Sequence, residues 1–281
     1  PAVLAQPAYP SKPITIVVGY PPGGSTDLTG RTLGDALSRQ LGVPVVIENL
    51  GGAGGTIGAQ KVASAAPDGY TLLVGANNEV AISKLVTKTV KYELKDFTPL
   101  GLIASQPMVL VASTATGVKN LGEFIAKAKA APGKYSYGSS GVGTALHLAG
   151  EMVKERAGVF MTHIPYRGVA PLTSDLVGGN LEYGVFVLSS GLPHIKSGKV
   201  VALGTTEARR SPLTPDIPAL GEHPQLKGID IGTWFVLMGP ARLPEAVTTR
   251  LKTALAEALK SPEFRQKMEA SGSTEIGRAH V

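Results

Sequence analysis

Short apolar runs rich in β-branched residues alternate with helical patterns over the first hundred residues, and this alternation restricts the fold most. The runs are "ITIVVGY", "VPVVIEN" and "YTLLVGA", and helices are predicted over residues 26–41 and 55–66, with a less regular segment after the third run. Leu33, Leu37 and Leu41 share one face of the first predicted helix. Because strands that alternate with helices form parallel βαβ units, this part of the chain is predicted to be an α/β lobe.

A second series of the same kind begins near Asn120. It predicts helices over residues 121–131, 144–157 and 170–177, and strands in "YSYGS", "FMTHIPY", "LEYGVFVL" and "KVVALGT". The nearly continuous apolar stretch "FTPLGLIASQPMVLVAST" joins the two series, and the strand "IDIGTWFVLMGP" leads to a long predicted helix over residues 244–260. We therefore expect two α/β lobes, residues 1–104 with 230–281 and residues 105–229, joined by a hinge of two crossing strands.

The segment "GYPPGGSTD", residues 19–27, joins the first predicted strand to the first predicted helix, where a phosphate loop could lie. Ser25 stands where such a loop requires Lys, and two prolines remove backbone amides, so a nucleotide site is disfavoured. Gly24 still lets a ligand approach the backbone, and the first amides of the helix carry the positive end of its dipole. The loop therefore predicts a site for one carboxylate, with Asp27 stabilising the loop and the helix.

The segment "YGSSGVGTALHL", residues 137–148, repeats this arrangement, with a strand, a Gly/Ser loop and a helix that opens near Thr144. A lipase-type G-x-S-x-G motif fails because Val142 stands two residues after Ser140. A dinucleotide G-x-G-x-x-G motif fails because Leu146 stands at the third glycine position. Two helix N-termini, one from each lobe, are therefore expected to face one cleft.

Charge and residue types disfavour other functions. The 27 Lys and Arg residues exceed the 21 Asp and Glu residues, but no long basic block or basic-aromatic interleaving is present, so nucleic-acid binding is disfavoured. The chain has no cysteine, and its five histidines form no H-x-H or H-x-x-x-H pair, so we expect no metal and no cofactor. No local pattern indicates an activated nucleophile, which disfavours an enzyme.

The two ends of the chain carry less regular sequence. The opening "PAVLAQPAYPSKPI" lacks an initiator Met, and residues 3–5 are typical of the end of a signal peptide, which predicts export to the periplasm. No apolar run reaches the roughly 18 to 20 residues that a membrane span needs. The final "EIGRAHV" loses the amphipathic pattern of the preceding helices and is a candidate for a vector-derived tail.

Six segments together are more specific than any of them alone. They are "YPSKPITIVVGYPPGGSTD", "VVIENLGGAGGTIGA", "APDGYTLLVG", "YSYGSSGVGTALHLAGE", "HIPYRGVAPLTSDLVGGNLEYGVF" and "IPALGE". Over most of its length the chain thereby resembles the Bug-type extracytoplasmic solute receptors of tripartite tricarboxylate transporters. The resemblance implies a two-lobed periplasmic binding protein, which we expect to be a monomer, that closes on a small carboxylate and delivers it to a membrane permease.

The resemblance also implies which positions hold the carboxylate. In the family the two Gly-rich loops bind it largely through backbone amides and ordered water. The matching positions in this chain are Tyr20, Gly24, Ser25, Thr26, Ser139, Thr144 and Ala145. Bridging water is physically reasonable, because it costs little free energy and adapts to different ligands.

Further candidates flank these loops. Asn77 ends a strand and could contact the ligand or brace a loop, and we rank Asn78 below it. His147 is expected to pack or to reach the cleft, and Tyr166 and Phe186 could form an aromatic wall. Val187 stands where related receptors for amino acids can carry Asp, so a ligand ammonium group would have no partner.

These observations predict a receptor for a small organic carboxylate, with an aliphatic di- or tricarboxylate or an aromatic carboxylate as the ligand. One alternative is a sensor protein whose ligand-bound form docks on a membrane kinase instead of a permease. Another is a hydrolase with a site assembled only in three dimensions.

Overall fold

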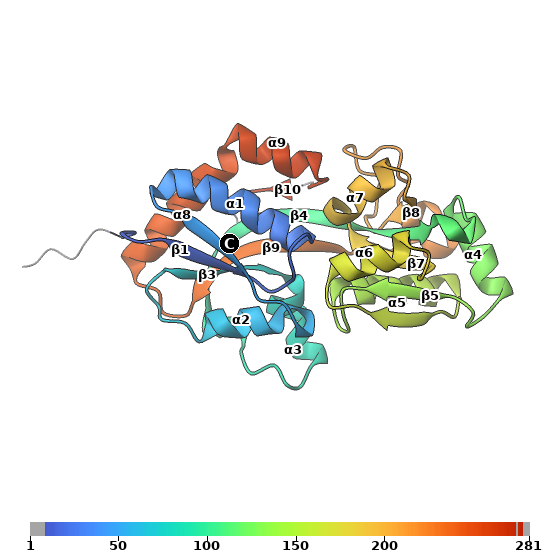
Figure 1. Ribbon diagram of the computed structural model, residues 1–281, viewed down its shortest axis with the longest axis horizontal. Coiled ribbons are helices and arrows are strands. Elements are labelled where there is room, and N and C mark those ends of the chain that lie inside the picture. The colour runs from blue at the N-terminus through green and yellow to red at the C-terminus, as the bar shows by residue number, and fades with distance from the viewer. Residues whose placement is uncertain (1–8, 274, 278–281) are drawn as a thin grey trace, which may run out of the picture.

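The computed structural model describes residues 9–273 and 275–277 and has two lobes side by side (Figure 1). The expected signal-peptide remnant at residues 3–5 lies outside the described residues. The helices and strands are β1 (Ile14–Val18), α1 (Ser25–Leu41), β2 (Val45–Asn49), α2 (Thr56–Ala63), β3 (Thr71–Ala76), α3 (Ser83–Val86), β4 (Phe97–Ser113), α4 (Leu121–Ala130), β5 (Ser136–Ser139), α5 (Ala145–Ala157), β6 (Thr162–Pro165), α6 (Val169–Val177), β7 (Tyr183–Val187), α7 (Leu188–Lys196), β8 (Val200–Thr205), β9 (Gly232–Pro240), α8 (Glu245–Lys260), α9 (Pro262–Ala270) and β10 (Glu275–Ile276).

Each lobe contains a sheet flanked by helices. In the first lobe the strand order is β2-β1-β3-β9-β4, and in the second it is β4-β7-β5-β6, with β8 also paired to β4. The pairs β1/β2, β1/β3, β5/β6 and β5/β7 are parallel, as the alternating sequence predicts. Both sheets are nevertheless mixed, because β9 and β4 run antiparallel to their neighbours.

Two strands join the lobes (Figure 1). Strand β4 pairs with β9 from Phe97 to Pro107 and with β7 from Met108 onward, so it passes from one sheet into the other. Strand β9 begins at Gly232, opposite Pro107, where the chain returns from the second lobe. This is the two-lobed α/β architecture with two crossing strands that the sequence predicts.

The end of the chain belongs to the first lobe. Helix α8 and helix α9 both pack against α1. The short strand β10 pairs with Ser105 and Ala104 of β4, so the first two residues of "EIGRAHV" are part of the fold and do not form a detached tail. The last four residues lie outside the described part of the chain.

The element boundaries differ from the sequence pattern mainly in the second lobe. The run "LEYGVFVL" reads as one strand, but β7 ends at Val187 and helix α7 begins at Leu188. The sequence conceals α7 because it is short and contains Gly191 and Pro193, two residues that usually interrupt helices. Leu188 and Leu192 are nevertheless buried on one face of it.

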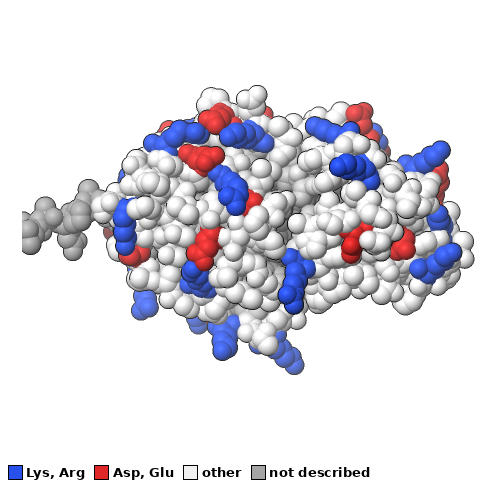
Figure 2. Space-filling view, viewed as in Figure 1, with Lys and Arg blue, Asp and Glu red and all other residues white. Residues whose placement is uncertain are grey.

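The surface carries both signs of charge. On the face shown in Figure 2, Lys and Arg side chains are interspersed with Asp and Glu side chains over both lobes, and neither sign forms a continuous patch. In the part of the chain that the structure describes, no helix is both long enough and apolar enough to span a bilayer.

Candidate functional site

The first loop places the N-terminus of α1 at the boundary between the lobes. Gly24 is the N-cap residue of α1, and no side chain caps the amides of the first turn by a hydrogen bond. Gly24, Ser25 and Thr26 line a cavity between the two lobes. Uncapped amides at the positive end of a helix dipole are suited to an anionic group.

Asp27 holds this loop in place. Its Oδ2 accepts from the Gly23 amide at 3.0 Å and its Oδ1 accepts from Asn49 Nδ2 at 2.9 Å. Arg31 Nη2 lies 3.0 Å from Oδ1. Burial opposes ionisation of this carboxyl, but the hydrogen bonds from Arg31, Gly23 and Asn49 hold its pKa below the usual value. Asp27 therefore stays ionised and braces the loop.

The second loop places the N-terminus of α5 against the same cavity. Thr144 is the N-cap residue, and its hydroxyl donates to Gly141 O at 2.9 Å and accepts from the His147 amide at 3.3 Å. The first helical amide, that of Ala145, donates to Oδ1 of Asn78 in the first lobe at 2.7 Å. The cleft thus has one helix N-terminus on each side, as the sequence predicts.

Ser139 and two histidines support the second loop from behind. The Ser139 hydroxyl accepts from the Gly141 amide at 3.2 Å and lies 2.8 Å from His163 Nε2. The ring of His163 stacks on that of His147 with centroids 4.1 Å apart. Burial lowers the pKa of His147, and burial together with nearby His147 lowers that of His163 to about 4, so both rings are neutral at pH 7.

This Ser-His pair is not arranged for catalysis. The Ser139 side chain is fully buried and lines neither of the cavities between the lobes. A serine nucleophile needs access to substrate as well as a histidine base that a third group orients. The pair therefore stabilises the loop that presents α5.

The inner cavity between the lobes is small and uncharged. Its volume is about 30 Å³, which is room for a few water molecules. It is lined by Tyr20, Pro21, Gly24, Ser25, Thr26, Ala76, Asn78, Ser140, Ala145, Leu146, Val169, Val187, Thr233 and Phe235. None of these residues carries a formal charge, so polar recognition here depends on amides, hydroxyls and one carboxamide.

An outer cavity of about 310 Å³ adjoins the inner one, and Tyr20 and Ser140 line both. Residues 52–55 form its wall in the first lobe, and Tyr166 and Arg167 form part of its wall in the second. Arg167 is exposed and is the charged residue of this lining. The outer cavity therefore has room for the part of a ligand that extends beyond its head group.

Most of the predicted site residues meet at this cleft. Tyr20, Gly24, Ser25, Thr26, Ala145 and Val187 line the inner cavity, and Tyr166 lines the outer one. Ser139, Thr144 and His147 lie behind the lining. The first two fix the second loop through the hydrogen bonds described above, and His147 Nδ1 accepts from the Gly143 amide at 3.1 Å.

The other two predicted residues neither line a cavity nor hold the second loop. Phe186 is fully buried in a core cluster on the other face of β7, because neighbouring residues of a strand point to opposite sides and Val187 faces the cleft. Asn77 braces the start of β9: its Nδ2 donates to Gly232 O at 3.1 Å, and Thr233 Oγ1 donates to its Oδ1 at 2.8 Å. Of the two roles expected for Asn77, ligand contact and loop bracing, its contacts correspond to bracing.

Eight residues that line the inner cavity are not among the predicted site residues, and Asn78, Thr233 and Phe235 are three of them. Asn78, ranked below Asn77, turns into the inner cavity at the start of the π-helical turn η2 (Asn78–Ile82). Thr233 and Phe235 reach it from β9 at alternate positions. Because residues two apart in a strand share a face, the sequence could have predicted that Thr233 and Phe235 point the same way. It could not have predicted which face of β9 meets the cleft.

Tyr20 connects the cavity to a buried carboxyl group. Its hydroxyl donates to Gly54 O at 2.8 Å, accepts from Asn78 Nδ2 at 2.7 Å and lies 3.3 Å from Oε2 of Glu79. Burial raises the pKa of Glu79 to about 8. The carboxyl is therefore mostly protonated at pH 7 and places little negative charge behind the inner cavity.

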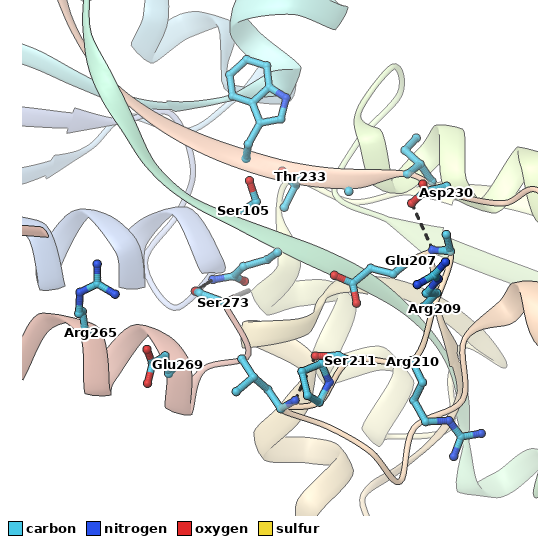
Figure 3. Close-up of a pocket in the computed structure, with 17 residues that line it drawn as sticks. Ser105, Glu207, Arg209, Arg210, Ser211, Asp230, Thr233, Arg265, Glu269 and Ser273 are labelled. Atoms are coloured by element: carbon cyan, nitrogen blue, oxygen red, sulfur yellow. Dashed lines mark hydrogen bonds between the residues drawn. The ribbon is translucent and has the colours of Figure 1, made fainter. Parts of the chain in front are cut away.

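A larger cavity, of about 1040 Å³, lies outside this cleft (Figure 3). Arg265 and Glu269 of α9 and the segment 207–213 of the second lobe line it, together with Trp234 of β9. Figure 3 shows charged side chains of both signs around it. We call it the rear groove. Among the residues that the structure describes, its lining includes no helix N-terminus and none of the predicted site residues. The interlobe cleft is therefore the candidate ligand site despite its smaller volume.

Comparison with known proteins agrees with the arrangement of the two lobes. Residues 29–276 match the family model described as the tripartite tricarboxylate transporter family receptor. The protein BugT of Bordetella pertussis is 33% identical over 279 residues, which cover 98% of this chain and 85% of BugT.

Two solved structures from Rhodopseudomonas palustris are similar along nearly the whole chain. One, solved with adipate, is 32% identical with a TM-score of 0.92 and covers 96% of this chain and 90% of its own. The other, MatC with bound malate, is 30% identical with a TM-score of 0.90 and covers 96% of this chain and 92% of its own. The chain therefore belongs to the tripartite tricarboxylate transporter receptors, a family of periplasmic solute-binding proteins and not of enzymes.

Proposed function

We propose that this receptor captures a small organic carboxylate between its lobes and delivers it to a membrane permease of the tripartite tricarboxylate type. One observation carries the proposal: the N-termini of α1 and α5, from different lobes, face the same uncharged cavity. Relatives solved with adipate and malate make carboxylates the first ligands to test. Delivery to a permease follows from membership of the receptor family.

The geometry favours a carboxylate head group over a positively charged or amino-acid ligand. Helix N-termini attract negative charge, and the inner cavity has no ionised acid to pair an ammonium group. Glu79 behind Tyr20 does not provide one at neutral pH, because its pKa is raised to about 8 by burial. Exposed Arg167 in the outer cavity adds a cation that could attract a second carboxylate.

Isothermal calorimetry with adipate, malate, benzoate and aspartate tests this function directly. The expected result is binding of at least one carboxylate at micromolar or lower dissociation constant, about −8 kcal/mol or more negative, with aspartate much weaker. Recovery of the bound ligand chemically unchanged separates a receptor from a hydrolase. Tight aspartate binding with no response to the other three would contradict the proposed head-group chemistry.

Gly24→Val tests the placement of the ligand on the α1 amides. A Cβ at Gly24 meets no atom within 4 Å, and the backbone φ of −89° suits any residue, so the fold should tolerate the change. The branched side chain would enter the cavity and block approach to the amides, and we expect at least a hundredfold loss of carboxylate affinity. Gly122→Val, on the exposed face of α4, is the matched control. Unchanged affinity in Gly24→Val would remove α1 from the site.

A further inference from the structure

One hydrogen bond across the cleft occupies a donor that the proposed ligand needs. The Ala145 amide, the first of α5, donates to Oδ1 of Asn78 at 2.7 Å, and Asn78 Nδ2 donates to the Tyr20 hydroxyl at 2.7 Å. Asn78 belongs to the first lobe, Ala145 belongs to the second, and both line the inner cavity. The carboxamide oxygen of Asn78 thus lies where an anionic oxygen would accept from a helix N-terminus.

We propose that the Asn78 side chain competes with the ligand for the first amide of α5 and thereby makes the site selective for anions. In the empty receptor its side-chain oxygen occupies the α5 amide and holds the lobes together, and a ligand carboxylate replaces it. This inference rests on the proposed function, because it assumes that the ligand uses the α5 amide.

The space in the cleft requires such a replacement. The inner cavity of about 30 Å³ has room for only a few water molecules, and the Ala145 amide already has an acceptor in Asn78 Oδ1. The neighbouring contacts between the lobes are apolar. Pro21 packs so closely on Gly168 that a Cβ added to Gly168 would lie 3.0 Å from Pro21 Cδ, and Val86 packs against Gly143. A ligand carboxylate can therefore reach the Ala145 amide only after the Asn78 side chain moves away.

The chemistry of the two acceptors gives the selectivity. A carboxylate accepts a stronger, charge-assisted hydrogen bond than a neutral carboxamide does, and the helix dipole adds to this difference. An anionic ligand therefore displaces Asn78, whereas a neutral amide or alcohol of the same shape gains nothing over the bond already present. The apparent affinity for the anion equals the intrinsic affinity multiplied by the fraction of receptor molecules in which Asn78 is not bonded to the α5 amide.

The first experiment needs no ligand. Because the chain has no cysteine, Val46→Cys and Val177→Cys provide unique spin-label positions, one exposed in each lobe. Pulsed electron paramagnetic resonance on the empty protein should show longer distances in Asn78→Ala than in the parent. Asn180→Ala, an exposed asparagine away from both cavities, should match the parent. Equal distance distributions in Asn78→Ala and the parent would overturn the proposal.

The second experiment measures affinity by calorimetry, with adipate and malate as probes. Asn78→Ala should bind the responding probe about threefold to tenfold more tightly, the factor expected from removing one competing neutral hydrogen bond. Asn78→Asp should lose binding while keeping its melting temperature, because a fixed carboxylate then occupies the α5 amide. Weaker binding by Asn78→Ala would make Asn78 a ligand contact and overturn the competition.

The two experiments keep the inferences separate. If the distances shift in Asn78→Ala but neither probe binds any variant, the contact between the lobes is supported and the proposed ligand class is what fails. If a probe binds the parent but the distances and the affinity are the same in Asn78→Ala, the proposed function stands and the role of Asn78 is overturned.

Discussion

At the residue scale, Glu79 shows how surroundings set the charge of a side chain. Only 1% of its surface is exposed, and within the described part of the chain its Oε1 has no hydrogen-bond partner. Desolvation penalises the ionised form, which is why the pKa rises to about 8. A neutral acid behind Tyr20 leaves the anion site free of electrostatic repulsion near pH 7.

Replacing this residue, Glu79→Gln, should change how stability depends on pH. Because the folded-state pKa of about 8 lies above the usual carboxyl value of 4.5, the native protein retains a proton that the unfolded chain has lost. The contribution of Glu79 is fully present below pH 4.5 and is lost as the pH rises toward 8, by up to about 1.4 kcal/mol per pH unit.

Urea unfolding of both proteins at several pH values between 5 and 9 would measure this. The free energy of unfolding of the parent should fall relative to that of Glu79→Gln up to about pH 8 and then run parallel to it. Parallel curves over the whole range would show that Glu79 ionises like an exposed carboxyl. Subtracting the unfolding free energies of the two proteins at each pH removes the contribution of the histidines. Their pKa values are lowered, so that contribution increases stability as the pH rises.

At the scale of elements, the hinge depends on how β9 is attached at its start. Asn77 follows β3 and binds both Gly232 and Thr233 of β9 through its side chain. Thr206, after β8, also holds this region, since its hydroxyl lies 3.0 Å from the Met108 amide of β4. Polar side chains thus fix the two crossing strands at the point where the chain passes between the lobes.

We expect Asn77→Ala to act on stability more than on affinity. The substitution removes two hydrogen bonds and leaves the buried Thr233 hydroxyl without its acceptor, so the free energy of unfolding should fall by about 1 to 3 kcal/mol. The exposed control Asn180→Ala should stay within about 0.5 kcal/mol of the parent. A large loss of carboxylate affinity at unchanged stability would instead make Asn77 a ligand contact.

At the scale of the whole molecule, the cleft and the rear groove lie at the same pair of crossing strands. Phe235 of β9 lines the inner cavity, Trp234 lines the rear groove, and Thr233 lines both. The groove is bounded by both lobes, with Arg265 on one side and the segment 207–213 on the other. Rotation of the lobes about β4 and β9 should therefore change the groove around the indole ring.

Trp234 is the single tryptophan of the chain, so its emission should report the lobe angle. If Asn78 holds the empty parent closed and the empty Asn78→Ala variant is open, adding a bound carboxylate should change the emission of the variant more than that of the parent. The titration should give the same dissociation constant as calorimetry. Constant emission in a variant whose spin-label distances change would show that the indole environment is insensitive to closure.

Local patterns in the sequence determined much of this protein. Short apolar runs rich in β-branched residues and leucine stripes such as Leu33, Leu37 and Leu41 reflect the backbone geometry of strands and helices, and these leucines are buried as predicted. Gly/Ser loops that follow strands and precede helices indicated both helix N-termini. Such signals depend on neighbouring residues, so they can be read without knowledge of the fold.

Only the tertiary structure decided which side chains face the cleft. Val187 rather than Phe186, and Asn78 rather than Asn77, line the inner cavity, because the pairing of β7 with β4 and the π-helical turn after β3 set their directions. The burial that raises the pKa of Glu79 likewise comes from distant residues around it. Strand register and desolvation depend on contacts between segments far apart in the chain, and no local pattern encodes them.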